Sequence, residues 1–179
     1  MIVALAGRRI DAPSADTPRF PSANEEMVRD RLRAMFVEKQ VQVLVCSAAC
    51  GADLLALEVA RDLGVRQRVV VPYAPARFRE TSVVDRPGDW GARFDAIIEV
   101  VEANGDLVVL GYAEGEETAY VPTNEAILEQ ATLLASQLQQ SVEAVVVWEG
   151  AARGEDDVTA AFVQAAQRRG IPVSYVVTL

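Results

Sequence analysis

Short apolar segments alternate with longer amphipathic segments along the whole chain. Each short segment has about the length of a strand, is rich in Val, Ile or Leu, and does not alternate with polar residues. Continuous apolar runs of this kind are typical of parallel strands that are covered on both faces. The pattern therefore predicts six strands, at Ile2–Ala6, Val43–Cys46, Val69–Pro72, Leu107–Leu110, Ala144–Trp148 and Val173–Val177.

The longer segments carry apolar residues at helical spacing, which predicts five amphipathic helices, one between each pair of consecutive strands. Ser22 and Glu25 have the spacing of a capping box at the start of the first helix, and Gly64 and Gly170 stand where helices are expected to end. This order predicts an α/β fold, a doubly wound and mainly parallel Rossmann-like sheet of about six strands with helices on both faces. We expect a single domain over residues 1–179.

Composition and charge narrow the class of protein. A net charge of −9 disfavours nucleic acid as the main partner. No apolar run reaches the roughly 18 residues of a membrane span, and the apolar start of the chain is interpreted as a strand rather than a targeting segment. Cys46 and Cys50 are expected to be buried thiols of a cytoplasmic protein. The absence of histidine excludes a Ser-His-Asp triad and a histidine metal site, and neither metal nor cofactor is expected.

The loops that follow strands are longer than those that follow helices. Residues 7–21, 73–89 and 111–122 follow predicted strands, whereas residues 64–67 suffice after a helix. In an open parallel sheet, ligands bind beyond the carboxyl ends of the strands, where the strand order reverses. We therefore expect a binding site at this edge.

Small residues form the turn after the second strand, over Ser47–Asp53. Small side chains let a ligand approach the backbone, and N–H groups at a helix start attract phosphate, but a tight turn capped by Asp53 explains the same residues. Arg8 and Arg9 directly follow the first strand. A guanidinium there is suited to phosphate or carboxylate, and a surface salt bridge is the alternative.

Three further segments place polar residues at this edge. The loop over residues 72–87 mixes cations, among them Arg86, with hydroxyls and an aromatic ring, and is interpreted as a lid or as an ordered surface loop. Thr123 is predicted to cap the fourth helix, and Asn124 either binds a ribose or base or stabilises the turn. Asp156 and Asp157 suit ribose hydroxyls or cap the last helix.

Four short motifs occur together: Gly7-Arg8-Arg9-Ile10-Asp11, Arg19-Phe20-Pro21, the segment Ser47–Asp53, and Phe78-x-x-x-Ser82-Val83. On these motifs the chain resembles the SLOG superfamily, which includes the DNA-processing protein Smf and the Lonely Guy phosphoribohydrolases. The likeness covers nearly the whole chain and is closer to the SLOG domains that bind nucleotides as sensors.

This resemblance implies a Rossmann-like fold, a nucleotide or nucleotide-derived ligand, and a homodimer as one assembly. The ligand would lie across Gly7, Arg8, Ser47, Gly51 and Asp53. The chain departs from the family where Arg8 replaces the usual histidine and where residues 156–159 replace a Gly-Gly-Thr motif. The phosphoribohydrolase signature is absent, which favours a binder over an enzyme.

Three functions are compatible with these observations. The first is nucleotide binding or sensing without turnover; the second is hydrolysis or transfer at an N-glycosidic bond, which needs a carboxylate near the anomeric carbon. The third is a protein-interaction module with a vestigial pocket. The candidate catalytic carboxylates are Asp53, Glu58, Asp85 and Glu125. The predicted ligand-binding residues are Gly7, Arg8, Arg9, Ser47, Ala48, Gly51, Asp53, Arg86 and Asn124.

Overall fold

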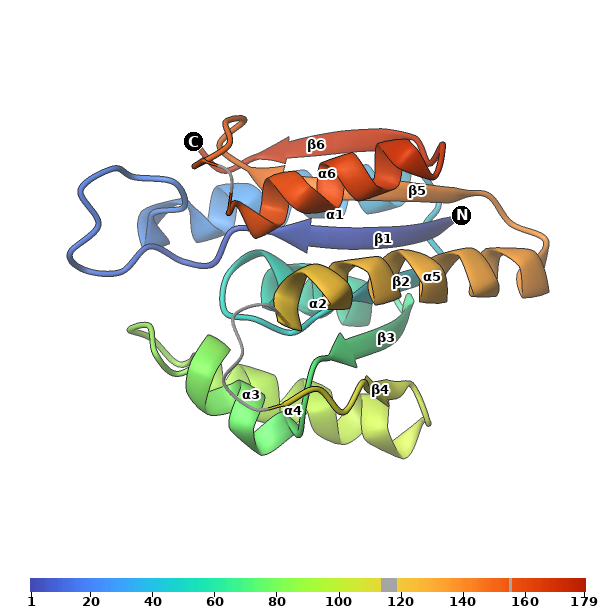
Figure 1. Ribbon diagram of the computed structural model, residues 1–179, viewed down its shortest axis with the longest axis horizontal. Helices are drawn as coiled ribbons and strands as arrows, with labels where there is room; N and C mark the ends of the chain where they lie inside the picture. The colour runs from blue at the N-terminus through green and yellow to red at the C-terminus, as the bar shows by residue number, and fades with distance from the viewer. Residues whose placement is uncertain (114–118, 155) are drawn as a thin grey trace.

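Six parallel strands form the sheet of the computed structural model, which describes residues 1–113, 119–154 and 156–179 (Figure 1). The strands are β1 (Ile2–Gly7), β2 (Val43–Cys46), β3 (Arg66–Val71), β4 (Leu107–Val109), β5 (Val142–Trp148) and β6 (Val173–Val177). Their order across the sheet is β4-β3-β2-β1-β5-β6. The predicted Rossmann-like α/β fold is confirmed.

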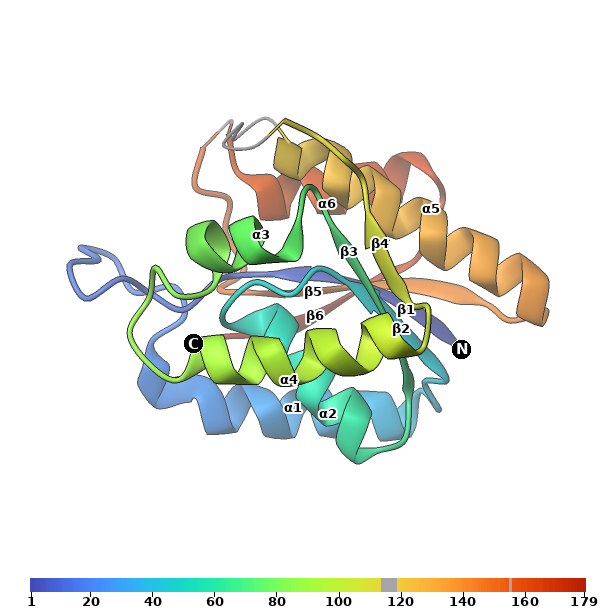
Figure 2. The ribbon, with the colours of Figure 1, turned by 90° about the horizontal axis from the view of Figure 1, so that it is seen from below.

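Helices cover both faces of this sheet (Figure 2). On one face lie α1 (Glu25–Glu38), α2 (Ala52–Asp62) and α4 (Trp90–Ala103), and on the other lie α5 (Tyr120–Leu138) and α6 (Val158–Arg168). The short helix α3 (Pro75–Ser82) follows β3 and packs against α4. A 3-10 turn, η1 (Ser22–Asn24), precedes α1. None of the described helices is long and apolar enough to cross a membrane.

The chain winds away from β1 in two directions. It runs outward through β2 and β3 to β4, and α5 then carries it back across the sheet to β5, on the other side of β1. β1 and β5 pair from Ile2↔Val142 to Gly7↔Val147. The strand order reverses between these two strands, so the helices that follow them diverge to opposite faces and leave a crevice at the carboxyl edge.

Each face of the sheet has its own apolar core. Alternate residues of β1 contribute to different cores: Val3 and Leu5 pack under α1, α2 and α4, whereas Ile2 and Ala4 pack under α5 and α6. Side chains of a strand alternate between the two faces, so a strand covered on both sides needs apolar residues at every position. This explains the continuous apolar runs in the sequence.

Two predictions about the segments at the carboxyl edge are wrong. Residues 75–82, expected to be loop, form α3, because Pro75 suits a first helical turn and Phe78 is anchored in the core, stacked on Phe94. Thr123 does not cap a helix, since α5 begins at Tyr120 and the Thr123 hydroxyl donates to the carbonyl of Ala119, one turn earlier.

The two predicted helix ends are confirmed, whereas the predicted capping box at the start of the first helix is wrong. Gly64 and Gly170 follow α2 and α6 with φ of +69° and +67°, as expected of glycines that end helices. The capping box of Ser22 and Glu25 is not formed, because η1 replaces the first turn there. The residues that precede η1 and α1, Pro21 and Asn24, make no side-chain cap bond.

Candidate functional site

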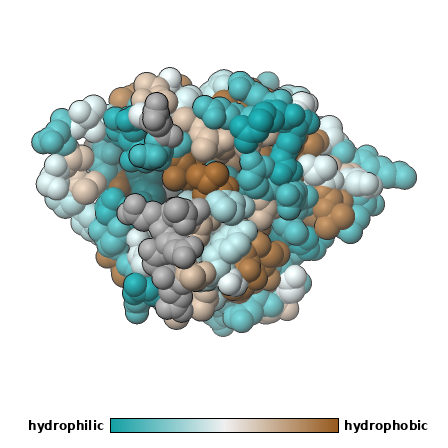
Figure 3. Space-filling model, in the orientation of Figure 1, coloured by the Kyte–Doolittle hydropathy of each residue, from teal (hydrophilic) through white to brown (hydrophobic). Residues whose placement is uncertain are grey.

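A cavity of about 1170 Å³ opens at the carboxyl edge of the sheet. Its walls come from the end of β1 and the loop after it, the turn between β2 and α2, helix α3, and the first turns of α5 and α6. In Figure 3, a hollow left of the centre brings hydrophilic and hydrophobic surface together. The cavity lies where the strand order reverses, which is the position expected for a ligand in this class of fold.

The described lining of this cavity is basic in an otherwise acidic chain. The chain as a whole carries 17 basic and 26 acidic residues. The charged residues that line the cavity are Arg8, Arg9, Arg19, Arg77, Arg86 and Arg153, together with Asp11, Asp53, Asp156 and Asp157. Glu149 and Asp157 neutralise Arg8 and Arg19. The positive charge that favours an anionic ligand therefore lies at Arg9, Arg86 and Arg153.

The guanidinium of Arg8 donates hydrogen bonds to other groups of the protein. It donates from Nη1 and Nη2 to the two carboxylate oxygens of Asp157, at 2.7 and 2.8 Å, and from Nε to Glu149 at 2.6 Å. Nη2 also donates to the carbonyl of Ala151, at 2.8 Å. Arg8 was expected to bind phosphate, but its donors already have acceptors within the protein. It instead connects the end of β1 to the end of β5 and the start of α6.

Asp157 is the best satisfied carboxylate of the cavity. It caps α6 by accepting from the N–H groups of Thr159 and Ala160, and it also accepts from the N–H of Arg153. Burial alone raises the pKa of such a group, but the bonds from Arg8 and the backbone hold the pKa of Asp157 well below its ordinary value. The helix-capping interpretation of this residue is the one that the structure supports.

Asp53 is equally enclosed but has few partners. It lies in the first turn of α2, is 7% exposed, and accepts from the N–H of Ala49 at 3.2 Å. Burial raises the pKa of Asp53 to about 7, outweighing the opposing effects of the Ala49 N–H and of Arg9. A carboxyl group that titrates near neutral pH inside a cavity is typical of functional sites.

The other three candidate carboxylates do not line the cavity. Each is held by two arginines at 2.6–3.0 Å: Glu58 by Arg29 and Arg93, Asp85 by Arg9 and Arg86, and Glu125 by Arg168 and Arg169. These ion pairs give each of the three carboxylates a structural role. Asp53 alone of the four stands where it can meet a ligand.

The small residues of the β2–α2 turn permit a close approach of protein backbone rather than of ligand. A Cβ on Gly51, whose φ is +101°, would lie 2.6 Å from the backbone nitrogen of Ile10. A Cβ on Gly7 would lie 2.5 Å from the Cβ of Ala52. The N–H of Ala52, expected to attract phosphate, donates instead to the carbonyl of Arg8 at 3.0 Å.

Ser47 and Ala48 differ within the same turn. Ala48 is fully buried and does not line the cavity. Ser47 does line it, and its buried Oγ has no hydrogen-bond partner in the part of the chain that the structure describes. An unsatisfied buried hydroxyl costs about 1–3 kcal/mol, so Ser47 is a candidate contact for a ligand.

A cluster of four hydroxyl groups lies along one side of the cavity. The Tyr120 hydroxyl lies 3.0 Å from Ser82 Oγ and 3.2 Å from the Tyr73 hydroxyl, which in turn lies 2.8 Å from Thr81 Oγ1. The cluster connects α3 to the start of α5. The sequence pattern does not indicate this cluster, because it predicts a loop over residues 75–82 and a helix that begins at Thr123, whereas α5 begins at Tyr120.

Arg153 is a further residue of the cavity that the sequence prediction missed. Its side chain is half exposed in the loop between β5 and α6, and its Nε lies 3.8 Å from Asp157, a carboxylate already bonded to Arg8. Burial and the nearby charge of Arg8 lower the pKa of Arg153. The signal that would have found it is its place after a strand, the same rule that selected Arg8 and Arg9.

The remaining predicted ligand-binding residues, Arg9, Arg86 and Asn124, line the cavity and also make contacts within the protein. Arg9 and Arg86 line the cavity and share the carboxylate of Asp85, at 2.9 and 2.7 Å. Asn124 lines it as well, and donates to the carbonyl of Val158 at 2.8 Å, which connects α5 to α6.

The described residues contain no cluster of three or more His, Cys, Asp or Glu side chains that could hold a metal ion. Comparison of the chain with models of known protein families and with curated proteins gives no match.

Proposed function

We propose that this chain binds a nucleotide or a nucleotide-derived anion in the cavity at the carboxyl edge, as a binding or sensing domain. The observation that carries the proposal is the basic lining of this cavity in a chain of net charge −9. The side near α3 and α5 is aromatic and aliphatic, with Tyr73, Phe78, Tyr120 and Val121 among its residues. In a nucleotide, the phosphate matches the arginines and the base matches the aromatic and aliphatic side.

The phosphate fits best at the arginines whose charge is least neutralised. Arg9 and Arg86 share one carboxylate, that of Asp85, so this group keeps one net positive charge. Arg153 faces Asp157 at 3.8 Å, and Arg8 already neutralises that carboxylate. These three side chains are 23–50% exposed, so they are accessible to a ligand. Paired hydrogen bonds from arginine to phosphate are strong and directional.

Binding is tested by thermal unfolding with AMP, ADP-ribose, NAD and adenosine. A ligand at a hundred times its Kd stabilises the folded state by about 2.7 kcal/mol. Arg153→Gln should weaken AMP by about tenfold or more and leave adenosine unchanged, because it removes a charged donor to phosphate. Arg33→Gln, which removes a cation from α1 outside this site, serves as the control. If no nucleotide shifts unfolding, the proposal is wrong, and an interaction module with a vestigial pocket becomes the better hypothesis.

Cleavage of an N-glycosidic bond is the second candidate, and the position and pKa of Asp53 favour it. A carboxyl group with a pKa of about 7 can exchange a proton at neutral pH. In such a reaction water adds to the anomeric carbon, the bond to the base breaks, and the base leaves with a proton. Release of base from AMP or NAD that disappears in Asp53→Asn would support hydrolysis. Release that persists in this variant excludes Asp53 as its acid or base.

A further inference from the structure

Two aspartates begin helices around the same cavity and differ sharply in their partners. Asp157, 3% exposed, accepts hydrogen bonds from Arg8 and from three backbone N–H groups. Asp53, 7% exposed, accepts from the N–H of Ala49 through Oδ2. A buried carboxylate is stable only with several donors, so Asp53 has capacity for a donor that a ligand brings.

Ser47 adds a second unsatisfied group on the same turn. Its Oγ is buried without a hydrogen-bond partner among the described residues, although the residue lines the cavity. A hydroxyl group can both donate and accept, and the residue that carries this one lines the cavity. Ser47 and Asp53 together therefore offer a hydroxyl and a carboxylate to a ligand group that both donates and accepts.

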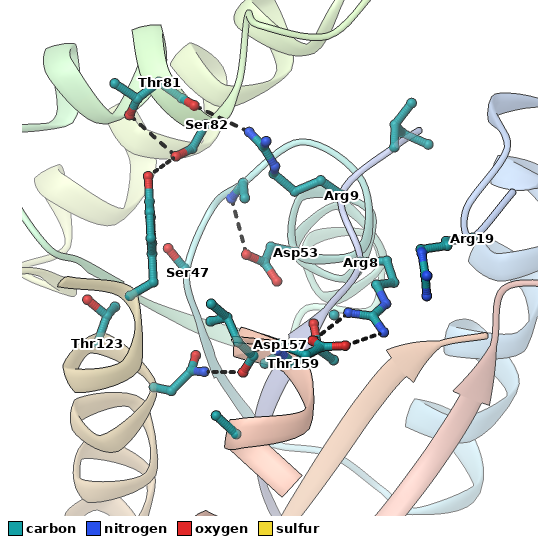
Figure 4. Close-up of a pocket in the computed structure, with 18 of the residues that line it drawn as sticks. Arg8, Arg9, Arg19, Ser47, Asp53, Thr81, Ser82, Thr123, Asp157 and Thr159 are labelled. Carbon is teal, nitrogen blue, oxygen red and sulfur yellow. Dashed lines mark hydrogen bonds and ion pairs between the residues drawn. The ribbon is translucent and has the colours of Figure 1, made fainter. Parts of the chain in front are cut away.

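The position of Ser47 and Asp53 in the cavity indicates which part of a nucleotide they would contact. Figure 4 shows Ser47 and Asp53 between Thr81 and Ser82 on one side and Arg8 and Arg19 on the other. A nucleotide with its base toward the hydroxyl cluster and its phosphate toward Arg153, which lies beside the Arg8–Asp157 pair, has its sugar between them. A carboxylate repels phosphate but accepts readily from sugar hydroxyls.

We propose that Asp53 and Ser47 bind the ribose hydroxyls, which makes the site selective for ribonucleotides over deoxyribonucleotides. The inference rests on the proposed nucleotide binding and adds the class of sugar. Asp53 is the main contact, with Oδ1 accepting from one hydroxyl while Oδ2 keeps the bond to Ala49. Ser47 contacts the neighbouring hydroxyl. A deoxynucleotide would leave one of these two groups buried without its partner.

Calorimetric titration with AMP, 2′-deoxy-AMP and 3′-deoxy-AMP tests this selectivity. The wild type should bind AMP about tenfold or more tightly than at least one of the two deoxy analogues, which is the effect of one hydrogen bond to a charged group. Asp53→Ala should reduce this ratio to about one for the analogue that lacks the hydroxyl bound by Asp53. Asp53→Asn, which keeps the shape and a neutral acceptor, should give an intermediate ratio and stands in if the alanine variant does not fold. Ser47→Ala should reduce the discrimination against one analogue.

Asp62→Asn is the matched control, since Asp62 is a carboxylate at the far end of the same helix, paired with Arg33. It should leave all three affinities unchanged. Equal binding of AMP and both deoxy analogues by the wild type overturns the ribose contact and leaves nucleotide binding intact. A ratio that survives both Asp53→Ala and Ser47→Ala also overturns it. Binding of none of the three overturns the proposed function itself.

Discussion

Arg8 and Asp157 form a two-point ion pair inside the candidate site, with Nη1 and Nη2 of the guanidinium at 2.7 and 2.8 Å from the two carboxylate oxygens. The two side chains are 3% and 0% exposed. Because Asp157 also caps α6, this one contact joins the end of the central strand to the helix on the far side of the crevice. The shape of the cavity therefore depends on it.

Replacing Arg8 should destabilise the fold rather than remove phosphate affinity selectively. Arg8→Met leaves Asp157 and Glu149 buried without their main cation, and breaking a buried pair in this way costs about 3–5 kcal/mol. Urea unfolding measures the loss. Arg33→Met removes an exposed pair with Asp62 and should cost less than about 1 kcal/mol. A stable Arg8→Met protein that loses AMP but retains adenosine would restore Arg8 as a phosphate ligand.

Asp53 should make stability depend on pH between about 4 and 7. Burial raises the pKa of Asp53 from an ordinary value of 3.8 to about 7, so the folded protein binds this proton more tightly than the unfolded chain does. The resulting stabilisation is complete below pH 4 and is lost as the pH rises toward 7. The free energy of unfolding of the wild type, relative to Asp53→Asn, should fall over this range by on the order of 2–4 kcal/mol.

Chemical unfolding of both proteins at several pH values measures this difference. Parallel pH profiles for the wild type and Asp53→Asn would show that Asp53 is not perturbed. Asp157→Asn provides a contrast of opposite sign, since the low pKa of Asp157 contributes stability that is lost only as the pH falls below about 4.

Gly51→Ala should be much more costly than Gly64→Ala, although both glycines have positive φ. At Gly64 no atom of the described residues lies within 4 Å of the added Cβ, so the cost is about 1 kcal/mol of backbone strain. At Gly51 the Cβ meets the backbone of Arg8, Arg9 and Ile10 at 2.6–2.9 Å, and the two segments must separate. We expect a loss above about 3 kcal/mol in thermal or urea unfolding. Equal losses would contradict this packing.

Tyr120→Phe tests the hydroxyl cluster. The substitution removes the contacts to Ser82 and Tyr73 and keeps the ring, so stability should fall by about 1–2 kcal/mol. Amide hydrogen exchange should rise in α3 more than in α4, because the cluster connects α3 to α5. Tyr175→Phe, which alters a half-exposed tyrosine on β6 that does not line the cavity, should leave exchange in α3 unchanged. Unchanged exchange in the Tyr120 variant would show that other contacts hold α3.

The strands and the edge at which the cavity opens were predictable, because both follow from local patterns. Residues 2–6 are apolar at every position as a strand between two helical layers requires, and long loops after strands indicate the ligand-binding edge. Helix α3 was missed because it is only eight residues long and buries just Phe78 and Ser82, too few positions to show a helical period.

The roles of individual charged residues were not predictable from local patterns. Arg8 and its partner Glu149 are 141 positions apart in the chain, so no spacing rule indicates that they meet. The same applies to Glu58, whose partners Arg29 and Arg93 lie on two other helices. Asp53 and Ser47 were predictable as residues at this edge because they belong to the turn itself, and both line the cavity. That Asp53 has few partners, and that the Ser47 hydroxyl has none among the described residues, emerges only from the tertiary structure.

The pairing of β1 with β5 has a consequence for the order in which the molecule folds. These neighbours in the sheet are joined through the whole of β2, β3, β4 and α5, so their contact closes the longest loop between adjacent strands. Contacts between residues so distant in the chain form slowly, because closing a long loop costs entropy before any contact offsets it. The crevice exists only once β5 lies beside β1. The proposed ligand binding would then depend on this slow contact. A chain emerging from the ribosome would gain affinity only after β5 and the start of α6, which also lines the cavity, have been synthesised.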